Sequence, residues 1–435
     1  MGFQLRRAPS CSPLVGTANG QTLVWDAARA EWNVELPPAP VGSQANPVFV
    51  ERYLASNGND VRLAIIAALA QNPPPSTDFW LPSGAFVFDA ILSQLHGLRN
   101  GLNFVGQGTH LYRDVQGQDT GQVIFFFRND YGAGHADRIT FRGIRFSLFN
   151  ALTSFFGYAI GLAAASNCSI VDCEFDCTLV PETSAGKQRW GCAFFGASSP
   201  GTDAGCDNAI RDVRLTNAQI QGCGAGRSTR NLLIRAIVAN DCNDLCISVC
   251  STGAGQSIEN VLIDDVACFG VIGSGVILAG QDGNAPGEPL GLVRNVTISN
   301  LLLAGSRADD LDFAFAGTVL FYGGILTRSV VFSKISSKLS GNSVGQSFGL
   351  NISACPEATS WEGLSITDCQ FDVVNDNDPT EQIVIDVPIL DGLTVSDVRC
   401  KGPRGFRFVN CDKIVMNDVV MDAGGIILSA RTRPI

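Results

Sequence analysis

The sequence predicts an all-β protein whose main domain is a right-handed parallel β-helix, a solenoid of about ten coils. A pattern of the form apolar-x-apolar-x-(Asp/Asn)-apolar-x-apolar recurs about ten times along the 435 residues. Its polar marker returns at intervals of 35, 34, 34, 29 and 21 residues from 265 through 300, 334, 368 and 397 to 418, and periods of roughly 20–50 residues are typical of solenoids and propellers. No alternation of strands and helices is visible. A propeller would also need four antiparallel strands and hairpin turns in each repeat, which the sequence does not show.

Each copy of the pattern joins two short runs in which apolar residues alternate with others, and this alternation indicates strands with one buried face. The alternation slips at the marker residue, so the chain is expected to bend there. Asp and Asn suit such a bend because they tolerate turn geometry and can bond to nearby backbone. The clearest copies are Cys168–Phe175, Val261–Cys268, Val296–Leu303, Leu364–Phe371, Leu393–Cys400 and Ile414–Met421, and looser ones are Ile139–Phe146, Val213–Ile220, Leu232–Ala239 and Val330–Ser337, with Gly143, Asn217, Ala236 and Lys334 as markers.

Residues 1–50 are predicted to be a separate N-terminal module. Gly20, Leu23 and Trp25, with Trp32 downstream, resemble the Gly-x-x-Leu-x-Trp hairpin modules at the start of phage tail fibre and spike proteins. Those modules help to attach their protein to the virion. The resemblance therefore implies contacts between residues 1–50 and other virion proteins, and the alternative is an arbitrary hairpin that happens to carry tryptophans.

Residues 51–115 are predicted to contain a capping helix and the first coils. Asp60 precedes the segment VRLAIIAALAQ, which has the pattern of an amphipathic helix and is followed by Pro73–Pro75. The segments FWLPSGAF and LNFVGQG come next. This order is similar to the opening of the pectate-lyase-like superfamily, to which phage tailspikes and capsular depolymerases belong. The resemblance implies a helix that closes the open end of a parallel β-helix over residues 116–435.

The charge and the apolar content of the sequence argue against some classes of binding partner. The net charge is −11 and the pI is about 4.8, and no basic patch is visible, which argues against nucleic-acid binding. No apolar run is long enough for membrane insertion. The N-terminus lacks the apolar core of a secretion signal. We therefore expect synthesis in a host cytoplasm without a signal peptide.

The 15 cysteines fall largely on apolar positions of the repeat, where a thiol behaves as a small hydrophobe. Their spacings do not match zinc sites, so no metal and no cofactor is expected. Reduced thiols are in keeping with folding in a cytosol.

Several acidic and aromatic residues are candidates for glycan chemistry, which needs paired carboxylates or a base beside a cation. Asp244 lies in a segment, Asn240–Ile247, that resembles the Asp-Asp-Cys-Ile strand of polygalacturonases. Asn243 replaces one catalytic Asp of that family, and Gly273-Ser274-Gly275 lacks its histidine. The alternative is that Asp241 and Asp244 are solvated or turn residues.

The other candidates lie in longer insertions between coils, where the binding loops of solenoids occur. Their alternative interpretation is a plain solvated loop or, for the tryptophan, a side chain that fills a gap in the wall. The catalytic candidates there are Asp309, Asp310 and Asp312, and the substrate-binding candidates are Asp282, Glu288 and Trp190, the last for stacking on a sugar ring.

These observations together predict a spike or fibre protein of a phage or phage-like virion that binds host surface polysaccharide, with or without cleaving it. Many tailspikes continue into a β-sandwich or trimerisation tail, whereas this chain stops at Ile435 soon after its last repeat. A homo-oligomer, with a trimer first, is what the resemblance implies. Two alternatives stay open: a secreted bacterial polysaccharide lyase or hydrolase, and a structural decoration protein of a virion.

Overall fold

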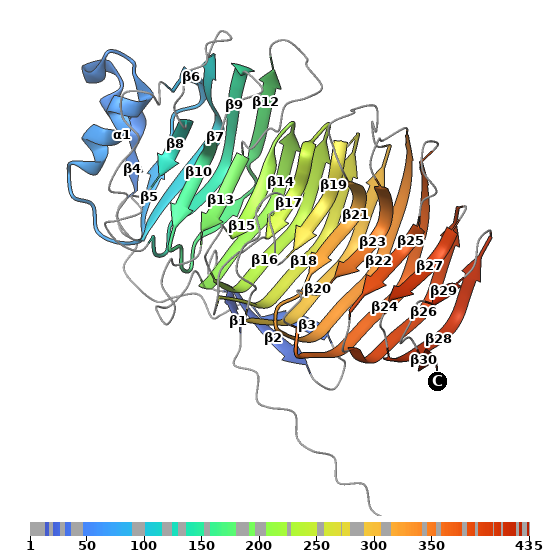
Figure 1. The fold of residues 1–435 in the computed structure, drawn as a ribbon. Coiled ribbons are helices and arrows are strands. Elements are labelled where there is room, and N and C mark those ends of the chain that lie inside the picture. Colours follow the sequence, from blue (N-terminus) through green and yellow to red (C-terminus); the bar gives the residue numbers. More distant parts are fainter. Residues whose placement is uncertain are drawn as a thin grey trace, which may run out of the picture.

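The computed structural model of the chain is a parallel β-helix whose strands stack along one axis (Figure 1). The structure describes residues 14–16, 21–26, 31–35, 47–88, 101–114, 124–128, 136–151, 157–179, 191–195, 206–223, 228–249, 256–270, 272–278, 291–305, 315–341, 346–353, 358–375, 381–387, 390–402, 404–409, 412–422, 426–428 and 433–434.

Two parallel sheets form the wall of the β-helix, in agreement with the predicted fold. The 16-stranded sheet contains β4 (Val48–Phe49), β5 (Thr77–Trp80), β6 (Gly84–Val87), β7 (Leu102–Asp114), β9 (Thr140–Ala151), β11 (Ser169–Val171), β12 (Glu174–Leu179), β14 (Cys206–Thr216), β16 (Thr229–Asn240), β18 (Ser257–Phe269), β20 (Leu292–Ala304), β22 (Leu326–Gly341), β24 (Ser360–Asn375), β26 (Leu390–Lys401), β28 (Asp412–Met421) and β30 (Arg433–Pro434). The 11-stranded sheet contains β8 (Ile124–Arg128), β10 (Gly157–Ala163), β13 (Gly191–Phe195), β15 (Gln219–Cys223), β17 (Asn243–Val249), β19 (Ile272–Leu278), β21 (Phe315–Tyr322), β23 (Gln346–Ser353), β25 (Glu381–Asp386), β27 (Arg404–Val409) and β29 (Ile426–Leu428). Neighbouring strands of each sheet therefore come from successive coils, and the pairs β5 and β6, and β11 and β12, each lie end to end within one coil.

The predicted bends are present in the backbone. The marker residues adopt the left-handed conformation, with φ of 52° at Asp172, 55° at Asp265 and 49° at Asn300. Ala236 and Lys334, which carry no Asp or Asn side chain, have the same conformation, with φ of 55° and 52°. The bend is thus a property of the coil, and Asp or Asn is only the residue that tolerates it best.

One marker of the predicted repeat is wrong by five residues. β14 pairs with β16 so that Val213 lies opposite Ile237, which places Asp212, with φ of 56°, beside Ala236 at the bend. Asn217 lies at the next bend. The pattern was hidden because Asn208 occupies the first apolar position of this copy. Its buried amide accepts a hydrogen bond from the Cys168 backbone N–H at 2.9 Å and donates one to the Ala165 carbonyl at 2.8 Å.

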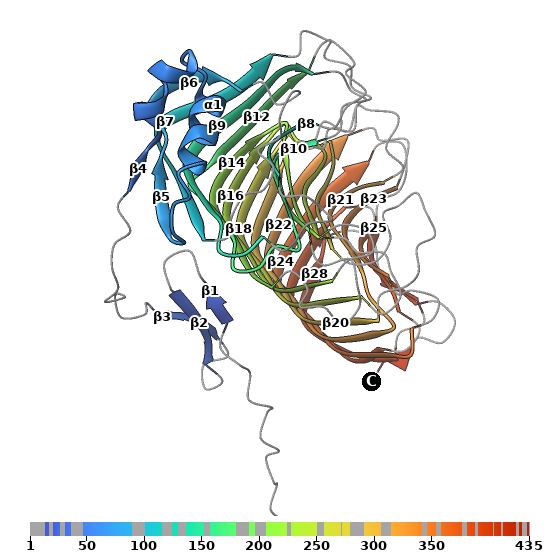
Figure 2. The ribbon, with the colours of Figure 1, turned by 90° about the vertical axis from the view of Figure 1, so that its left-hand side faces the viewer.

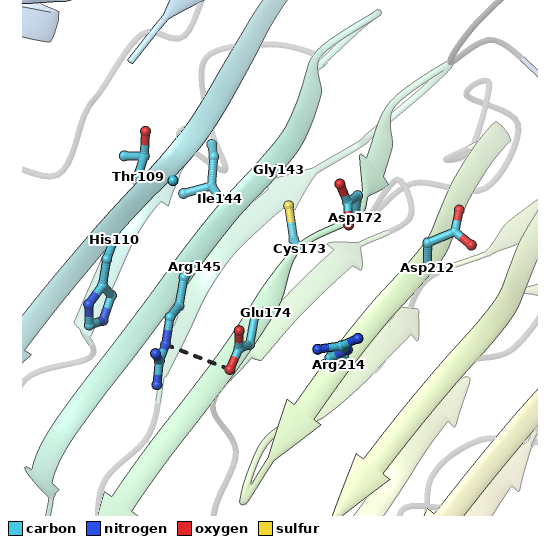
Figure 3. A pocket seen from close by; sticks show the side chains of 11 residues that line it. Thr109, His110, Gly143, Ile144, Arg145, Asp172, Cys173, Glu174, Asp212 and Arg214 are labelled. Atoms are coloured by element: carbon cyan, nitrogen blue, oxygen red, sulfur yellow. Dashed lines mark ion pairs between the residues drawn. The ribbon is translucent and has the colours of Figure 1, made fainter. Parts of the chain in front are cut away.

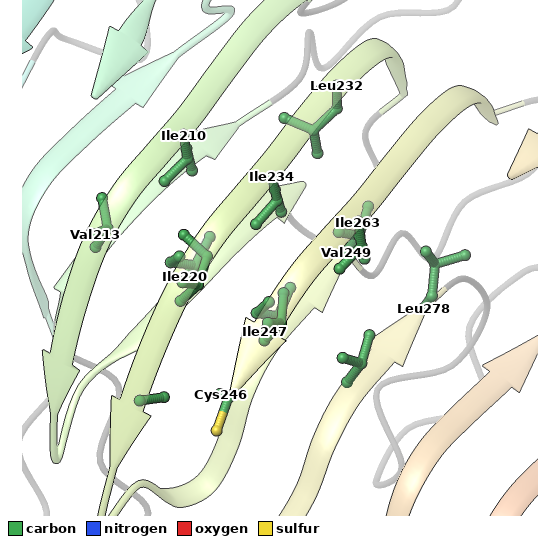
Figure 4. Packing of buried hydrophobic residues seen from close by; sticks show 14 of the residues in the cluster. Ile210, Val213, Ile220, Leu232, Ile234, Cys246, Ile247, Val249, Ile263 and Leu278 are labelled. Atoms are coloured by element: carbon green, nitrogen blue, oxygen red, sulfur yellow. The ribbon is translucent and has the colours of Figure 1, made fainter. Parts of the chain in front are cut away.

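Like residues lie above one another in the core, because strand pairing without a register shift brings the same position of each coil into line. Ile210, Ile234 and Ile263 form such a row, fully buried, in β14, β16 and β18 (Figure 4). Aromatic rings stack in the first coils, where the centroids of Phe104 and Phe141 are 5.1 Å apart. This row-by-row packing fixes the register of the outer face as well.

Asparagines form a second aligned feature at the bend five residues before the markers. The Asn260 side chain donates a hydrogen bond to Asn231 Oδ1 at 2.7 Å, and Asn295 donates to Asn260 Oδ1 at 2.8 Å. Asn231 in turn donates to Asp207 Oδ1 at 2.8 Å. Each amide thus satisfies its neighbour along the axis, as in other stacked-strand structures.

A short helix covers the N-terminal end of the core, as the sequence predicts. Helix α1 (Val61–Leu69) follows two 3-10 turns (Val50–Tyr53 and Ala55–Asn57), and its N-cap is Asp60. The Asp60 carboxylate accepts hydrogen bonds from the backbone N–H groups of Arg62 and Leu63 at 2.8 and 3.1 Å. The side chains that α1 buries are Val61, Ala64, Ile65 and Ala68.

The tryptophan motif near the N-terminus forms the predicted hairpin. Strands β1 (Leu14–Gly16), β2 (Gln21–Asp26) and β3 (Glu31–Glu35) make an antiparallel sheet in which Trp25 lies opposite Trp32. The boundaries of the module at residue 50 and of the first coils at residue 115 stay predictions. No helix among the described residues is long and apolar enough to span a membrane.

Nine of the ten cysteines whose side chains the structure describes are buried. Burial, and secondarily the neighbouring Cys242 and Cys268 thiols, raise the pKa of Cys246, so the aligned rows bring some thiols together. Burial raises the pKa of Cys168 and of Cys369 to about 12. These thiols are therefore protonated at neutral pH and act as core residues.

Candidate functional site

A continuous row of outward-facing side chains runs along the 16-stranded sheet, two residues after the marker bend of each coil. Strand register places each member beside the next. We call this the outer row, and its members are His110, Arg145, Glu174, Arg214, Val238, Ala267, Leu302, Ser336, Gln370, Arg399 and Val420.

A surface hollow of about 450 Å³ lies at the N-terminal end of the outer row (Figure 3). Its lining comes from strands β7, β9, β12 and β14 and from the bend between β11 and β12. The lining residues are Gly108, Thr109, His110, Gly143, Ile144, Arg145, Asp172, Cys173, Glu174, Asp212 and Arg214. The described lining residues all stand on wall strands or on the bends between them, where every second side chain points outward.

Ion pairs fix the centre of the hollow. The Arg145 guanidinium lies 3.2 Å from an Asp176 carboxylate oxygen and 3.6 Å from one of Glu174, as Figure 3 shows for the second pair. Arg145 and Glu174 keep 44% and 39% of their side chains exposed, so solvent screens their attraction and the pair contributes little to stability. The pair sets the Arg145 guanidinium and the Glu174 carboxylate side by side at the surface.

Three further charged groups at the hollow have no such partner. Arg214, Asp172 and Asp212 make no ion pair and no side-chain hydrogen bond with another residue in the part of the chain that the structure describes. Asp172 and Asp212 occupy left-handed bends, with φ of 52° and 56°. These exposed groups are free to bind a ligand, Arg214 as a donor and the carboxylates as acceptors.

His110 joins the hollow to an aromatic group. Its Nε2 lies 2.8 Å from Ser147 Oγ, and its ring centroid lies 5.4 Å from that of Tyr112 and 6.3 Å from that of Phe149. Burial, and secondarily the nearby Arg145 charge, lower the pKa of His110. The imidazole is therefore neutral at pH 7, with one nitrogen able to accept a hydrogen bond.

The arrangement is suited to a ligand with many hydroxyl groups. Carboxylates accept hydrogen bonds from hydroxyls, the guanidinium donates them in a fixed fork, and the half-buried rings of Tyr112 and Phe149 offer apolar surface alongside. Carboxylates outnumber the two guanidinium groups here, since Asp172, Glu174, Asp176 and Asp212 all lie at or beside the hollow. A strongly anionic ligand is thus disfavoured.

The candidates chosen from the sequence are not the residues that form this hollow. Asp244 lies in β17 with its backbone beside Gly273, but its side chain is outside what the structure describes. The other six lie outside the described residues and stay predictions: Asp309, Asp310, Asp312, Asp282, Glu288 and Trp190. Asp241 is exposed at a left-handed bend, with φ of 50°, which agrees with its interpretation as a turn residue.

Sequence reasoning missed the outer row because its members occupy unrestricted positions of the repeat. The signal that could have found them is the column of residues one place before the last apolar position of the repeat, when the copies are aligned in register. That column changes from charged residues in the first coils to Val238, Ala267 and Leu302 in the middle ones.

No protein-family model matches the sequence, and a search of curated proteins finds no relative. Among solved structures, the chain is similar to PfbA, a surface adhesin of Streptococcus pneumoniae, with 12% identity and a TM-score of 0.47 over 89% of this chain and 91% of that one. It is also similar to the catalytic domain of an α-1,3-glucanase in complex with tetrasaccharides, with 10% identity and a TM-score of 0.47 over 92% and 69% of the two chains.

A third similar structure is the tailspike protein of E. coli bacteriophage HK620 in complex with a pentasaccharide, with 11% identity and a TM-score of 0.40 over 89% and 80% of the two chains. These neighbours are pectate-lyase-like parallel β-helix proteins. At such identities and TM-scores the likenesses carry no information about activity.

Proposed function

We propose that this chain is a spike protein of a phage or phage-like virion and that it binds host surface polysaccharide in the hollow at the N-terminal end of the outer row. The observation that carries the proposal is the hollow itself. There Arg214, Asp172 and Asp212 are exposed beside the ion pair of Arg145 and Glu174, and they have no ion pair or side-chain hydrogen bond among the described residues. Donors and acceptors are interleaved there at the spacing of strands, roughly 4.8 Å.

The rigidity of the wall favours a binding role. The residues of the hollow stand on paired strands, so their backbone loses its conformational entropy on folding and not on ligand binding. The partners of Arg145 and of His110, at 3.2 Å and 2.8 Å, restrict side-chain rotation further. A polysaccharide presents many weak contacts of this kind, and a preorganised surface adds them without a large entropic loss.

The N-terminal hairpin supports the virion part of the proposal. Trp25 and Trp32 lie opposite each other in β2 and β3, in the module whose sequence resembles attachment modules of phage fibres. We propose that residues 1–50 contact another virion protein and that the assembled spike is a trimer. Light scattering of the purified protein tests the trimer, and co-purification with virion proteins of a chain lacking residues 1–50 tests the attachment.

The main experiment measures binding and cleavage together on host capsule or lipopolysaccharide. Reducing ends without absorbance of unsaturated uronates would indicate a hydrolase, and both signals together a lyase. Binding without either signal would indicate an adhesin. Neither binding nor cleavage of the confirmed host glycan would overturn the proposal and favour a structural decoration protein.

Two charge reversals on the outer row localise the site. We expect Arg214→Glu to weaken glycan binding at least tenfold, because it replaces an exposed hydrogen-bond donor of the hollow with a further carboxylate. Arg399→Glu is the matched control, since Arg399 belongs to the same row but lies far from the hollow in β26. Equal losses in the two variants would show that the hollow is not the binding site.

A further inference from the structure

The middle of the outer row is apolar although it faces solvent. Val238 and Leu302 each keep 40% of their surface exposed, and Ala267 lies between them in β18. Two residues further along the same strands, Phe269 is 39% exposed beside Ala304. Side chains two apart on a strand share a face. The five residues therefore form one patch, which we call the apolar patch.

The apolar patch continues the hollow directly. Arg214, the last member of the charged part of the row, is the register neighbour of Val238. The patch extends from β16 to β20, and the row turns polar again at Ser336 in β22. From β14 to β20 the row covers roughly 14 Å at the usual strand spacing. A chain-like ligand that leaves the hollow along the axis must therefore cross the patch.

The size of the patch decides what can cover it. Three side chains of this kind that are each about 40% exposed present of the order of 200 Å². A stable protein–protein interface needs about 800 Å² on each partner, so a second copy of the chain is a poor occupant. An unsubstituted sugar chain is a poor one too, because its hydroxyls would lose water over Val238 and Leu302 without gaining a partner.

We propose that the apolar patch binds methyl groups carried by the polysaccharide, from acetyl substituents or from 6-deoxy sugars. This inference rests on the proposed function, since the same ligand occupies the hollow. The hollow then supplies contacts to hydroxyls, and the patch selects substituted repeats. Each methyl group that leaves water for the patch contributes a factor of about four in affinity.

The test compares pairs of glycans in which one member carries a methyl-bearing substituent that the other lacks. The probes are the host polysaccharide before and after removal of ester-linked acetyl groups with mild alkali, cellohexaose against chitohexaose, and a 6-deoxy-mannan against a mannan, with dissociation constants measured by calorimetry. We expect tighter binding, by fourfold or more, of the methyl-bearing member in at least one pair. The pair that responds identifies whether an ester, an amide or a deoxy sugar supplies the methyl group.

The variant Val238→Ser combined with Leu302→Ser should abolish this preference while the methyl-free glycan binds as before. Val420→Ser is the matched control, because Val420 is a 49% exposed member of the same row at the far end of the molecule. All three side chains are exposed at the surface, so folding is retained and is checked by circular dichroism.

The outcomes separate the two proposals. Equal affinity within every pair, or a preference that survives in the double variant, overturns the role of the patch and leaves the hollow as the binding site. A wild-type chain that binds no member of any pair and no host polysaccharide overturns both.

Discussion

At the scale of single residues, the main feature of this chain is the left-handed backbone conformation at the bend of each coil. An L-residue other than Gly, Asn or Asp held near φ of +50° costs about 1–2 kcal/mol, and the coil imposes that conformation at the same place in successive turns. Asp265 and Asn300 suffer least because their side chains tolerate it. Ala236 and Lys334 adopt it with no such help. The conformation persists at these positions because the packed coils on either side determine it.

Replacing Ala236 with glycine should therefore stabilise the protein. Glycine adopts φ of +55° without a Cβ penalty, and we expect Ala236→Gly to raise the free energy of unfolding by about 1 kcal/mol. Urea denaturation measures the change. Ala267→Gly, in an ordinary strand position, is the control and should lower the free energy of unfolding by about the same amount. A loss of stability in both variants would contradict the strain at residue 236.

The histidine at the hollow should titrate below the ordinary value of 6.5. Burial lowers the pKa of His110, and the charge of Arg145 adds to this, while Asp176 and Glu174 oppose it. The unfolded chain therefore binds the proton more tightly than the folded one. The contribution of His110 to stability is fully present above pH 6.5 and is lost as pH falls through its folded pKa. NMR titration of the imidazole should show the lowered midpoint.

Arg145→Gln provides the matched change, since it removes the positive charge that faces His110 and keeps the shape of the side chain. The midpoint of His110 should then rise toward 6.5. A midpoint that stays unchanged would mean that burial alone accounts for the lowered pKa. A wild-type midpoint at or above 6.5 would contradict the lowered pKa of His110 and the hydrogen-bond acceptor that its neutral imidazole offers to a ligand.

At the scale of single elements, aligned amides tie one coil to the next. Asn260 donates to Asn231 at 2.7 Å and accepts from Asn295 at 2.8 Å, so it links β16, β18 and β20 outside the backbone ladder. Asn260 is also at a left-handed bend, with φ of 55°. The same residue therefore serves conformation and hydrogen bonding, and the two roles can be separated by mutation.

Asn260→Gly keeps the bend and removes only the side-chain hydrogen bonds. We expect a loss of about 2 kcal/mol in the free energy of unfolding, because two hydrogen bonds go and the amides of Asn231 and Asn295 lose a partner. Asn260→Ala should cost about 1 kcal/mol more, since alanine adds strain at the bend. Equal stability of the glycine variant and the wild type would show that the amide row contributes nothing.

Buried thiols of the coils should be inert in the folded chain. With a pKa of about 12, Cys168, Cys173, Cys369 and Cys400 carry almost no thiolate at pH 8, and the thiolate is the reactive form. Iodoacetamide at pH 8 followed by mass spectrometry should find these four unmodified until the protein is unfolded in urea. Cys206, which is only half-buried, is the internal comparison. Rapid native modification of the four would contradict their place in the core.

Prediction from sequence succeeded for the strands and bends because both follow local rules. Alternation and Asp or Asn at 265, 300, 368 and 397 needed no knowledge of other coils. It misplaced one bend at Asn217, because a buried, fully hydrogen-bonded Asn208 stands where an apolar residue was expected. The hollow was not predicted, since its neighbours Arg145, Glu174 and Arg214 are 29 and 40 residues apart in sequence and meet only through strand register.

At the scale of the whole molecule, the chain behaves as a one-dimensional array. Each coil contacts mainly its two neighbours, so stability is a sum of coils and of the interfaces between them. The two ends differ from the middle because each has one neighbour fewer. Helix α1 supplies the missing contacts at the N-terminal end, where Ile65 is fully buried.

Ile65→Ser should loosen that end alone. A buried isoleucine replaced by a small polar residue costs about 2–5 kcal/mol, and we expect hydrogen exchange to accelerate in β5, β7 and β9 while β22, β24 and β26 stay protected. Ile66→Ser is the control, since Ile66 is 38% exposed on the same helix. Uniform acceleration along the whole chain would show that the solenoid unfolds as one unit.

Because the register from β16 to β20 is unbroken, each coil adds one residue and one strand spacing to the length of the outer row. Deleting the 35 residues from Asp265 to Ser299 would remove one coil. The register of the remaining coils would be kept, because the bend at Asn300 would take the place of the bend at Asp265. In the shortened chain, Val238 would lie beside Leu302 in the outer row. The distance between the charged hollow and Ser336 can therefore change in evolution only by whole coils, which means in steps of one strand spacing.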